Sequence, residues 1–137
     1  MTLALDASMT IAWLFADERT AQVETVMLRV VDEGAVVPSL WRLEVANVLR
    51  GAWRRGRCDR AYADRSLRRL DRMPITTDDQ TDLQAWGAIW ELALDEQLTL
   101  YDAAYLELAL RLQLPLASGD VALCAAASRR GLEVLPP

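Results

Sequence analysis

Apolar residues along the chain fall into two alternating patterns. Short, mostly apolar runs typical of buried strands occupy residues 3–5, 35–37, 74–76, 114–117 and 132–135. Between them, apolar positions recur at the three- and four-residue spacing of helices, over residues 8–15, 20–33, 39–56, 58–72, 81–96, 98–112 and 121–130. This alternation predicts an α/β fold, in which helices cover both faces of a mostly parallel sheet. One domain over residues 1–137 is expected for this length without linkers or repeats.

Local features of several helices are also predicted. Ser8 and Ser39 stand where each can cap the helix that follows. The segment 81–96 is expected to be one continuous helix. Trp86 and Trp90 lie on its apolar positions and are therefore expected in the core rather than in a base-stacking surface.

Four carboxylates occupy unusual places in this pattern. Asp6 ends the first apolar run, and Asp120 follows the fourth. Asp102 lies in the first turn of a strongly apolar helix, and Glu44 lies inside another, where Asn47 can hydrogen-bond it. Ligands of parallel sheets bind beyond the carboxyl ends of the strands, so Asp6, Asp102 and Asp120 are expected to converge at one edge.

Each of these four acids also has an ordinary structural explanation. Asp6 and Asp120 precede helices and can act as N-caps. Asp102 is three residues after Thr99, which fits a capping box. Glu44 can be an exposed residue at the edge of the core. The pattern alone leaves both explanations open, although a carboxylate facing a core must be paired, hydrogen-bonded, metal-bound or protonated.

The composition narrows the possible chemistry. The chain has no histidine, and all fifteen basic residues are arginine. This excludes histidine-dependent triads, P-loop phosphate binding and lysine Schiff bases. The two cysteines are far apart in sequence, which suits a reducing cytoplasm, and no apolar run is long enough to cross a membrane. The remaining chemistry must depend mainly on carboxylates, hydroxyls and arginines, with or without a metal ion.

Converging carboxylates favour a divalent cation. Two carboxylates about 4 Å apart repel each other by roughly 4 kcal/mol at an effective dielectric constant near 20. The repulsion is relieved either by protonation or by a cation, and hard oxygen ligands select Mg²⁺ or Mn²⁺, as one ion or two. Such an ion lowers the pKa of a bound water and orients a phosphodiester, which predicts phosphodiester hydrolysis.

Charge is distributed unevenly along the chain. Residues 42–72 contain ten arginines and four acids, a net charge of +6, which leaves −11 for the rest of a chain whose total is −5. Nucleic-acid binding beside an acidic site is one interpretation, with Arg50, Arg54 and Arg57 as a stripe of possible RNA contacts. A solvated pair of helices with internal ion pairs is the other.

Four segments together resemble a known family. LALDASMTIAWLFADE, PSLWRLEVANVLRGA, LTLYDAAYLELALRL and PLASGDVAL resemble the successive motifs of PIN-domain ribonucleases, and most closely those of VapC-type toxins of bacterial toxin–antitoxin pairs. The resemblance covers nearly the whole chain. It implies a three-layer α/β/α sandwich with strand order 3-2-1-4-5, and an endoribonuclease that depends on Mg²⁺ or Mn²⁺.

The resemblance also implies roles for individual residues. The four acids match the catalytic and metal-binding acids of the family: Asp6, Glu44, Asp102 and Asp120. Asp6 and Asp102 match the principal metal ligands. Ser118 matches a position that is often threonine and orients a ligand or water, and Asn47 matches a recurrent asparagine beside the second acid. Ser8 is expected to support the site from beside Asp6.

Partners are implied in the same way. VapC-like proteins usually form homodimers, cut RNA to leave a 5′-phosphate and a 3′-hydroxyl, and are bound by a VapB-type antitoxin that enters the active-site groove. The alternative is a catalytically silent PIN-like module that binds RNA or protein. A phosphatase or receiver domain is disfavoured because both normally need a lysine, which this chain lacks.

Overall fold

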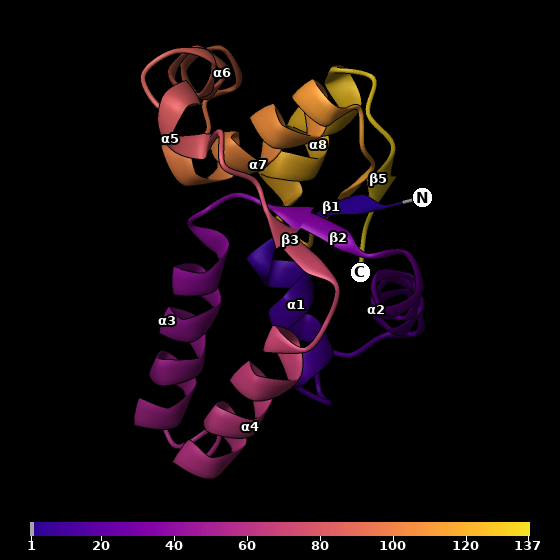
Figure 1. Ribbon diagram of the computed structural model, residues 1–137, viewed down its shortest axis with the longest axis vertical. Helices are drawn as coiled ribbons and strands as arrows, with labels where there is room; N and C mark the ends of the chain where they lie inside the picture. The colour runs from indigo at the N-terminus through magenta and orange to yellow at the C-terminus, as the bar shows by residue number, and fades with distance from the viewer. Residues whose placement is uncertain (1) are drawn as a thin grey trace.

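Five short parallel strands form the centre of the protein. The computed structural model describes residues 2–137 (Figure 1). The strands are β1 (Leu3–Leu5), β2 (Ala35–Val37), β3 (Ile75–Thr77), β4 (Leu116–Ala117) and β5 (Val134–Leu135). They pair in the order β3-β2-β1-β4-β5, and every pair is parallel. The predicted α/β fold and the strand order 3-2-1-4-5 are confirmed.

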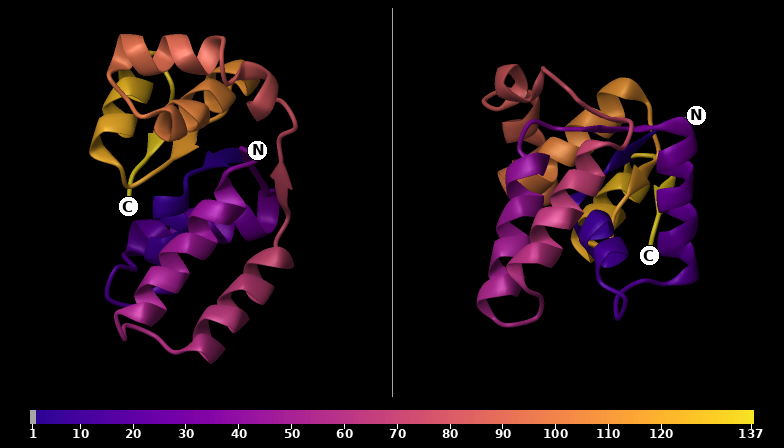
Figure 2. Two further views of the ribbon diagram at one scale, coloured as in Figure 1. Left: turned by 90° about the vertical axis from the view of Figure 1, so that its left-hand side faces the viewer. Right: turned by 60° about the horizontal axis from the view of Figure 1, so that its bottom comes forward.

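Eight helices of the described residues surround this sheet. They are α1 (Ala7–Leu14), α2 (Ala21–Glu33), α3 (Trp41–Arg54), α4 (Arg60–Asp71), α5 (Thr81–Gln84), α6 (Ala88–Glu96), α7 (Leu100–Leu112) and α8 (Val121–Arg129). Figure 2 shows helices α1 to α4 on one side of the sheet and α5 to α8 on the other. None of the helices described is both long and apolar enough to cross a bilayer.

Helix α7 lies at the centre of the core. All seven residues from Ala103 to Ala109 in α7 are buried, and the helix packs against the fully buried strand β1. A helix that is apolar on most of its sides must be covered on most of its sides. This position brings the start of α7, with Asp102, close to the end of β1, with Asp6.

The predicted continuous helix over residues 81–96 is wrong. The segment is broken between α5 and α6, and Gly87 stands at the N-cap of α6 with φ −116° and ψ −104°. The break leaves Trp86 outside both helices and 95% exposed, while Trp90 is 47% exposed. Their predicted place in the core is therefore also wrong, because α6 buries its other face, through Ile89, Leu92 and Ala93.

Two predicted helix caps differ in the structure. Helix α1 begins at Ala7 with Asp6 at the N-cap, so Ser8 is inside the helix. Helix α3 begins at Trp41, and Ser39 instead donates its backbone N–H to the hydroxyl of Thr81 at 3.2 Å. Neither serine is therefore an N-cap residue, and Ser8 lies in the first turn of α1, next to the end of β1.

Candidate active site

Four acids predicted from the sequence line one cavity. It has a volume of about 350 Å³ and is lined by Asp6, Ala7, Ser8, Ile11, Glu18, Glu44, Asn47, Val48, Asp102 and Asp120. The acids come from the end of β1, the first turns of α3 and α7, and the N-cap of α8. The expected convergence at the carboxyl edge of the sheet is therefore present, and it includes Glu44 from α3.

Asp6 is held by two serine hydroxyls. Its side chain is nearly buried, and its Oδ2 accepts hydrogen bonds from Ser8 Oγ at 2.6 Å and Ser118 Oγ at 2.7 Å. Burial raises the pKa of Asp6, and the two serine bonds partly oppose that rise. Although Asp6 stands at the N-cap of α1, its side chain makes no capping hydrogen bond. Capping therefore does not explain the side chain of Asp6.

The two serines also join the loops that carry the acids. Leu5 of β1 pairs with Ala117 of β4, so the residues that follow them, Asp6 and Ser118, end neighbouring strands. Ser8 Oγ accepts the N–H of Gly119 at 2.9 Å, and Ser118 Oγ accepts the N–H of Asp120 at 3.0 Å. Hydrogen bonds thus connect the start of α1 to the turn before α8, and they fix Asp6 relative to that turn.

Glu44 is held by a tyrosine that the sequence did not reveal. Its Oε1 accepts a hydrogen bond from the hydroxyl of Tyr105 at 2.5 Å, and Tyr105 is 0% exposed. Burial raises the pKa of Glu44, Asp6 raises it further, and the Tyr105 bond opposes both. Tyr105 follows Asp102 by three positions, so the two share a side of α7. This spacing was the one available signal, but it is equally typical of a core tyrosine.

Asp102 is the cavity carboxylate whose pKa is raised far above its ordinary value. Burial raises its pKa to about 6, with further contributions from the charges of Asp120, Asp6 and Glu44. Mutual repulsion is the behaviour expected of carboxylates that face the same space. The backbone N–H of Asp102 is bound by the Thr99 hydroxyl at 3.1 Å, so Thr99 caps α7.

Asp120 caps a helix and also lies at the cavity. Its Oδ1 accepts the N–H of Leu123 at 2.8 Å, which makes it the side-chain N-cap of α8. It also lines the cavity and contributes to the raised pKa of Asp102. The capping explanation is therefore correct for Asp120 but does not exclude it from the site.

The donor set suits a hard divalent cation in its chemistry. Carboxylates and hydroxyls are the oxygen ligands that Mg²⁺ and Mn²⁺ prefer. In residues 2–137, however, no three His, Cys, Asp or Glu side chains stand at the spacing of a formed metal site. Hydrogen bonds to Ser8, Ser118 and Tyr105 now occupy oxygens of Asp6 and Glu44. The cavity thus gathers suitable ligands without closing them around one point.

One predicted arginine lies elsewhere than expected. Helix α3 ends at Arg54, so Arg57 is beyond the helix and not part of a stripe on it. Its guanidinium contacts Asp17 at 2.9 Å and Glu18 at 2.6 Å, and it lies 3.9 Å from the ring centre of Phe15. Glu18 lines the cavity and was not predicted, because it lies in a loop without periodic pattern. Arg50 and Arg54 are on α3 and exposed.

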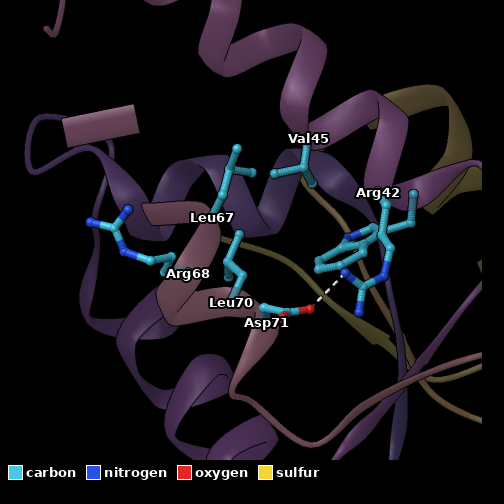
Figure 3. A pocket seen from close by; sticks show the side chains of 7 residues that line it. Arg42, Val45, Leu67, Arg68, Leu70 and Asp71 are labelled. Atoms are coloured by element: carbon cyan, nitrogen blue, oxygen red, sulfur yellow. Dashed lines mark hydrogen bonds and ion pairs between the residues drawn. The ribbon is translucent and has the colours of Figure 1, made fainter. Parts of the chain in front are cut away.

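A second cavity of about 360 Å³ lies between α3 and α4 and is mostly apolar (Figure 3). It is lined by Trp41, Arg42, Val45, Leu67, Arg68, Leu70 and Asp71. Arg42 and Asp71 form an ion pair at 2.9 Å across its edge. Because its one carboxylate is already paired, this groove offers no cluster of reactive groups, and the candidate chemistry belongs to the acidic cavity.

Comparisons with known proteins agree with the fold and the motifs. No curated protein matches the sequence. Six chains of solved structures match, and one of them is the crystal structure of PAE2754 from Pyrobaculum aerophilum. That chain is 26% identical, with a TM-score of 0.70, and the alignment covers 98% of this chain and 92% of the other. The sequence also matches the PIN domain, whose members are generally metal-dependent nucleases, over residues 3–128. The chain therefore belongs to the PIN-domain family.

Proposed function

We propose that this protein is a metal-dependent endoribonuclease and the toxin of a type II toxin–antitoxin system. The observation that carries the proposal is the convergence of Asp6, Glu44, Asp102 and Asp120 on one cavity at the carboxyl edge of a PIN-type sheet. Without histidine or lysine in the chain, these carboxylates are its main groups for acting on a phosphodiester. The resemblance of four motifs to VapC-type toxins supports the choice of RNA and of the toxin role.

The four acids have different roles in the proposed cation site. Asp6 and Asp102 are the main ligands for Mg²⁺ or Mn²⁺, and Glu44 and Asp120 complete the set. When bound, the ion supplies an activated water and offsets charge on the phosphate. Ser8 and Ser118 keep Asp6 oriented, and Asn47 lies at the cavity wall beside Glu44. Burial and the charges of the other three acids raise the pKa of Asp102 to about 6, and a cation held among them would offset the repulsion, so that Asp102 loses its proton more readily.

The reaction we propose is direct hydrolysis by water, in which the 2′-hydroxyl is not the nucleophile. The oxygen of water forms a new bond to phosphorus and the bond from phosphorus to the 3′-oxygen breaks. The 3′-oxygen takes up a proton that the water has released, which leaves a 5′-phosphate and a 3′-hydroxyl. Attack by a 2′-hydroxyl on a histidine-dependent pathway is closed to a chain without histidine.

Partners form part of the same proposal. A VapB-type antitoxin covers the acidic cavity, and two copies of the chain form a homodimer in the cytoplasm. An apolar row, which we define as Leu83, Trp86, Trp90 and Leu94, lies exposed on α5, α6 and the segment between them. Four large exposed apolar side chains within residues 83–94 support the presence of a protein partner, because burying them in an interface would remove them from water.

Cleavage of a mixed RNA pool tests the enzymatic proposal. Purified protein, stripped of any copurifying antitoxin, is incubated with Mg²⁺, Mn²⁺ or EDTA beside the variants Asp6→Asn and Asp32→Asn. Asp32 is an exposed acid on α2 and serves as the matched control. We expect cutting that requires the metal, disappears in Asp6→Asn and persists in Asp32→Asn. Binding of RNA without cutting under all conditions would instead support the silent module.

A further inference from the structure

The wall of the acidic cavity continues along one side of α3. Glu44, Asn47 and Val48 line the cavity. Gly51 follows Asn47 by four positions and Arg55 follows Gly51 by four, so the three lie in one row along the helix. Arg54 follows Asn47 by seven positions and borders the same row. Figure 1 shows α3 and α4 extending together away from the sheet, so this row leads outward from the cavity.

Arg55 is folded back along this row. A Cβ atom placed on Gly51 would lie 3.1 Å from Nη1 of Arg55, which means that the guanidinium rests against the helix at Gly51. Arg55 is the C-cap residue of α3, and its side chain therefore points back toward Asn47 and the cavity wall. The missing side chain of Gly51 leaves the space in which this guanidinium lies.

These arginines are not neutralised within the protein. Across residues 2–137, no carboxylate forms an ion pair with Arg54 or Arg55, whereas Arg57 contacts both Asp17 and Glu18. The uncompensated positive charge thus lies on the row that leaves the cavity. Arg50, by contrast, lines a groove between α3 and α4 on another side of the helix.

If an RNA strand binds at the acidic cavity, it needs positively charged side chains nearby. Five carboxylates line it, from Asp6, Glu18, Glu44, Asp102 and Asp120, and they repel phosphates. One or two bound divalent ions offset only the charge near the scissile phosphate. The neighbouring phosphates of the strand must therefore be held by cationic groups outside the cavity.

From this geometry we propose that Arg54 and Arg55 bind the backbone of single-stranded RNA beside the scissile phosphate. The proposal rests on the proposed nuclease function and names where the strand leaves the site. One turn of α3 advances about 5.4 Å, which is similar to the spacing of successive phosphates, so Asn47, Gly51 and Arg55 span about two nucleotides. Arginine guanidinium groups suit this role because they bind phosphate oxygens through two parallel hydrogen bonds.

Equilibrium binding separates this proposal from catalysis. Every protein carries Asp6→Asn so that the RNA stays intact, and the fluorescence anisotropy of a labelled single-stranded oligoribonucleotide is followed with Mg²⁺ present. The test variant is Arg54→Gln with Arg55→Gln. The matched control is Arg68→Gln with Arg72→Gln, which removes the same charge from α4 and its C-cap residue; Arg68 borders the groove in Figure 3.

We expect about a tenfold loss of affinity in the test variant, and a slope of log K against log salt that is smaller by roughly 1.4, since each phosphate contact on a single strand contributes about 0.7. The α4 control should stay within about threefold of its parent. Equal losses in both variants would indicate that RNA is attracted by the overall positive charge of α3 and α4 and not by specific contacts, and this would overturn the proposal. No loss of affinity in either variant would overturn it as well.

A polyglutamate peptide serves as a second probe. If the test variant loses peptide binding as strongly as RNA binding, the surface recognises acidic protein segments and the RNA proposal fails. Selective RNA binding in a protein that never cuts would contradict the proposed nuclease but leave the RNA path intact. In proteins that keep Asp6, cutting at low RNA concentration that is unchanged by Arg54→Gln with Arg55→Gln would overturn the RNA path and leave the proposed nuclease intact.

Discussion

The hydroxyl of Tyr105 donates to Oε1 of Glu44 at 2.5 Å and so joins α7 to α3 across the floor of the acidic cavity. Tyr105 is fully buried, and a buried hydroxyl needs a partner. The bond keeps one oxygen of Glu44 in place and leaves the other for the cavity. Glu44 therefore has a defined orientation although it lies on the partly exposed side of α3.

Replacing Tyr105 with phenylalanine is expected to destabilise the protein by about 1–2 kcal/mol, because a hydrogen bond to a carboxylate is lost while the ring stays packed. The pKa of Glu44 should rise further, since this bond is the contact that lowers it. Urea unfolding measures the first effect. Tyr101→Phe on the same helix is the control, because Tyr101 is 65% exposed, and it should change stability by less than about 0.5 kcal/mol. Equal effects of both variants would show that the Glu44 bond contributes nothing.

Burial of Asp102, together with repulsion by the neighbouring acids, predicts that Asp102→Asn stabilises the metal-free protein. The pKa of Asp102 is raised to about 6 from an ordinary value of 3.8, so the folded state binds this proton more tightly than the unfolded state does. Stability is then lost as pH rises from about 4 through 6, and the penalty is fully present above pH 6 to 7. Because the side chain is partly exposed, we expect a gain of about 1–2 kcal/mol rather than the full value for two pKa units.

Thermal unfolding in EDTA checks this prediction at two pH values. At about pH 7.5 the Asp102→Asn variant should melt above the wild type, and near pH 4 the difference should disappear. The exposed acid Asp32 provides the control through Asp32→Asn. A variant that melts no higher than the wild type at the upper pH would count against clustering of the four acids.

Metal addition should reverse the order of these two proteins. A cation that binds only the folded state stabilises it by about 2.7 kcal/mol at a concentration one hundred times its dissociation constant. Mg²⁺ or Mn²⁺ is therefore expected to raise the melting temperature of the wild type more than that of Asp6→Asn or Asp102→Asn. Calorimetric titration of the same proteins gives the affinities directly, and equal metal binding by all three would remove Asp6 and Asp102 from the ligand set.

The apolar row on α5 and α6 allows a test of the proposed homodimer. Trp86 is 95% exposed, and a tryptophan buried in an interface often contributes 2 kcal/mol or more. If two copies meet at this row, Trp86→Ser should weaken the dimer by at least about thirtyfold in sedimentation experiments. Leu28→Ser on α2, another exposed apolar residue, is the control and should leave association unchanged. A wild-type monomer at high concentration would contradict the homodimer itself.

The alternation of apolar strands and helices was enough to predict the fold class. The first strand, for example, covers residues 3–5 in both the pattern and the structure, and Asp6 follows it directly. The strand order came from the family resemblance, because the pattern alone does not distinguish one parallel order from another. The break at Gly87 was missed because a single glycine is tolerated in a helix, so the pattern continued through it. Burial of Trp86 and Trp90 was then assigned from a helix that does not exist as one piece.

The four acids could be found from sequence because each interrupts or ends an apolar segment. Tyr105 and Glu18 could not be found in this way. Tyr105 follows the same helical spacing whether its hydroxyl meets a carboxylate or water, and Glu18 belongs to a loop that has no period. Arg57 was misplaced because the pattern extended α3 past Arg54, although its last turn is closed by Arg55. These contacts depend on residues that the fold brings together from distant parts of the chain.

Gly51→Ala is expected to make the protein more stable and its RNA binding weaker. Alanine inside a helix is favoured over glycine by about 0.5–1 kcal/mol, which urea unfolding can measure. The added Cβ would approach Nη1 of Arg55 to 3.1 Å, so the flexible guanidinium must move away from the helix. If the Arg55 guanidinium binds a phosphate from its place beside Gly51, RNA affinity falls although no charge is removed.

The control for Gly51→Ala is the same substitution in a protein that already carries Arg55→Gln. There it should have no further effect on RNA affinity, because coupled residues are not additive. An RNA affinity that is unchanged by Gly51→Ala alone would show that Arg55 does not need the space at Gly51 to bind RNA.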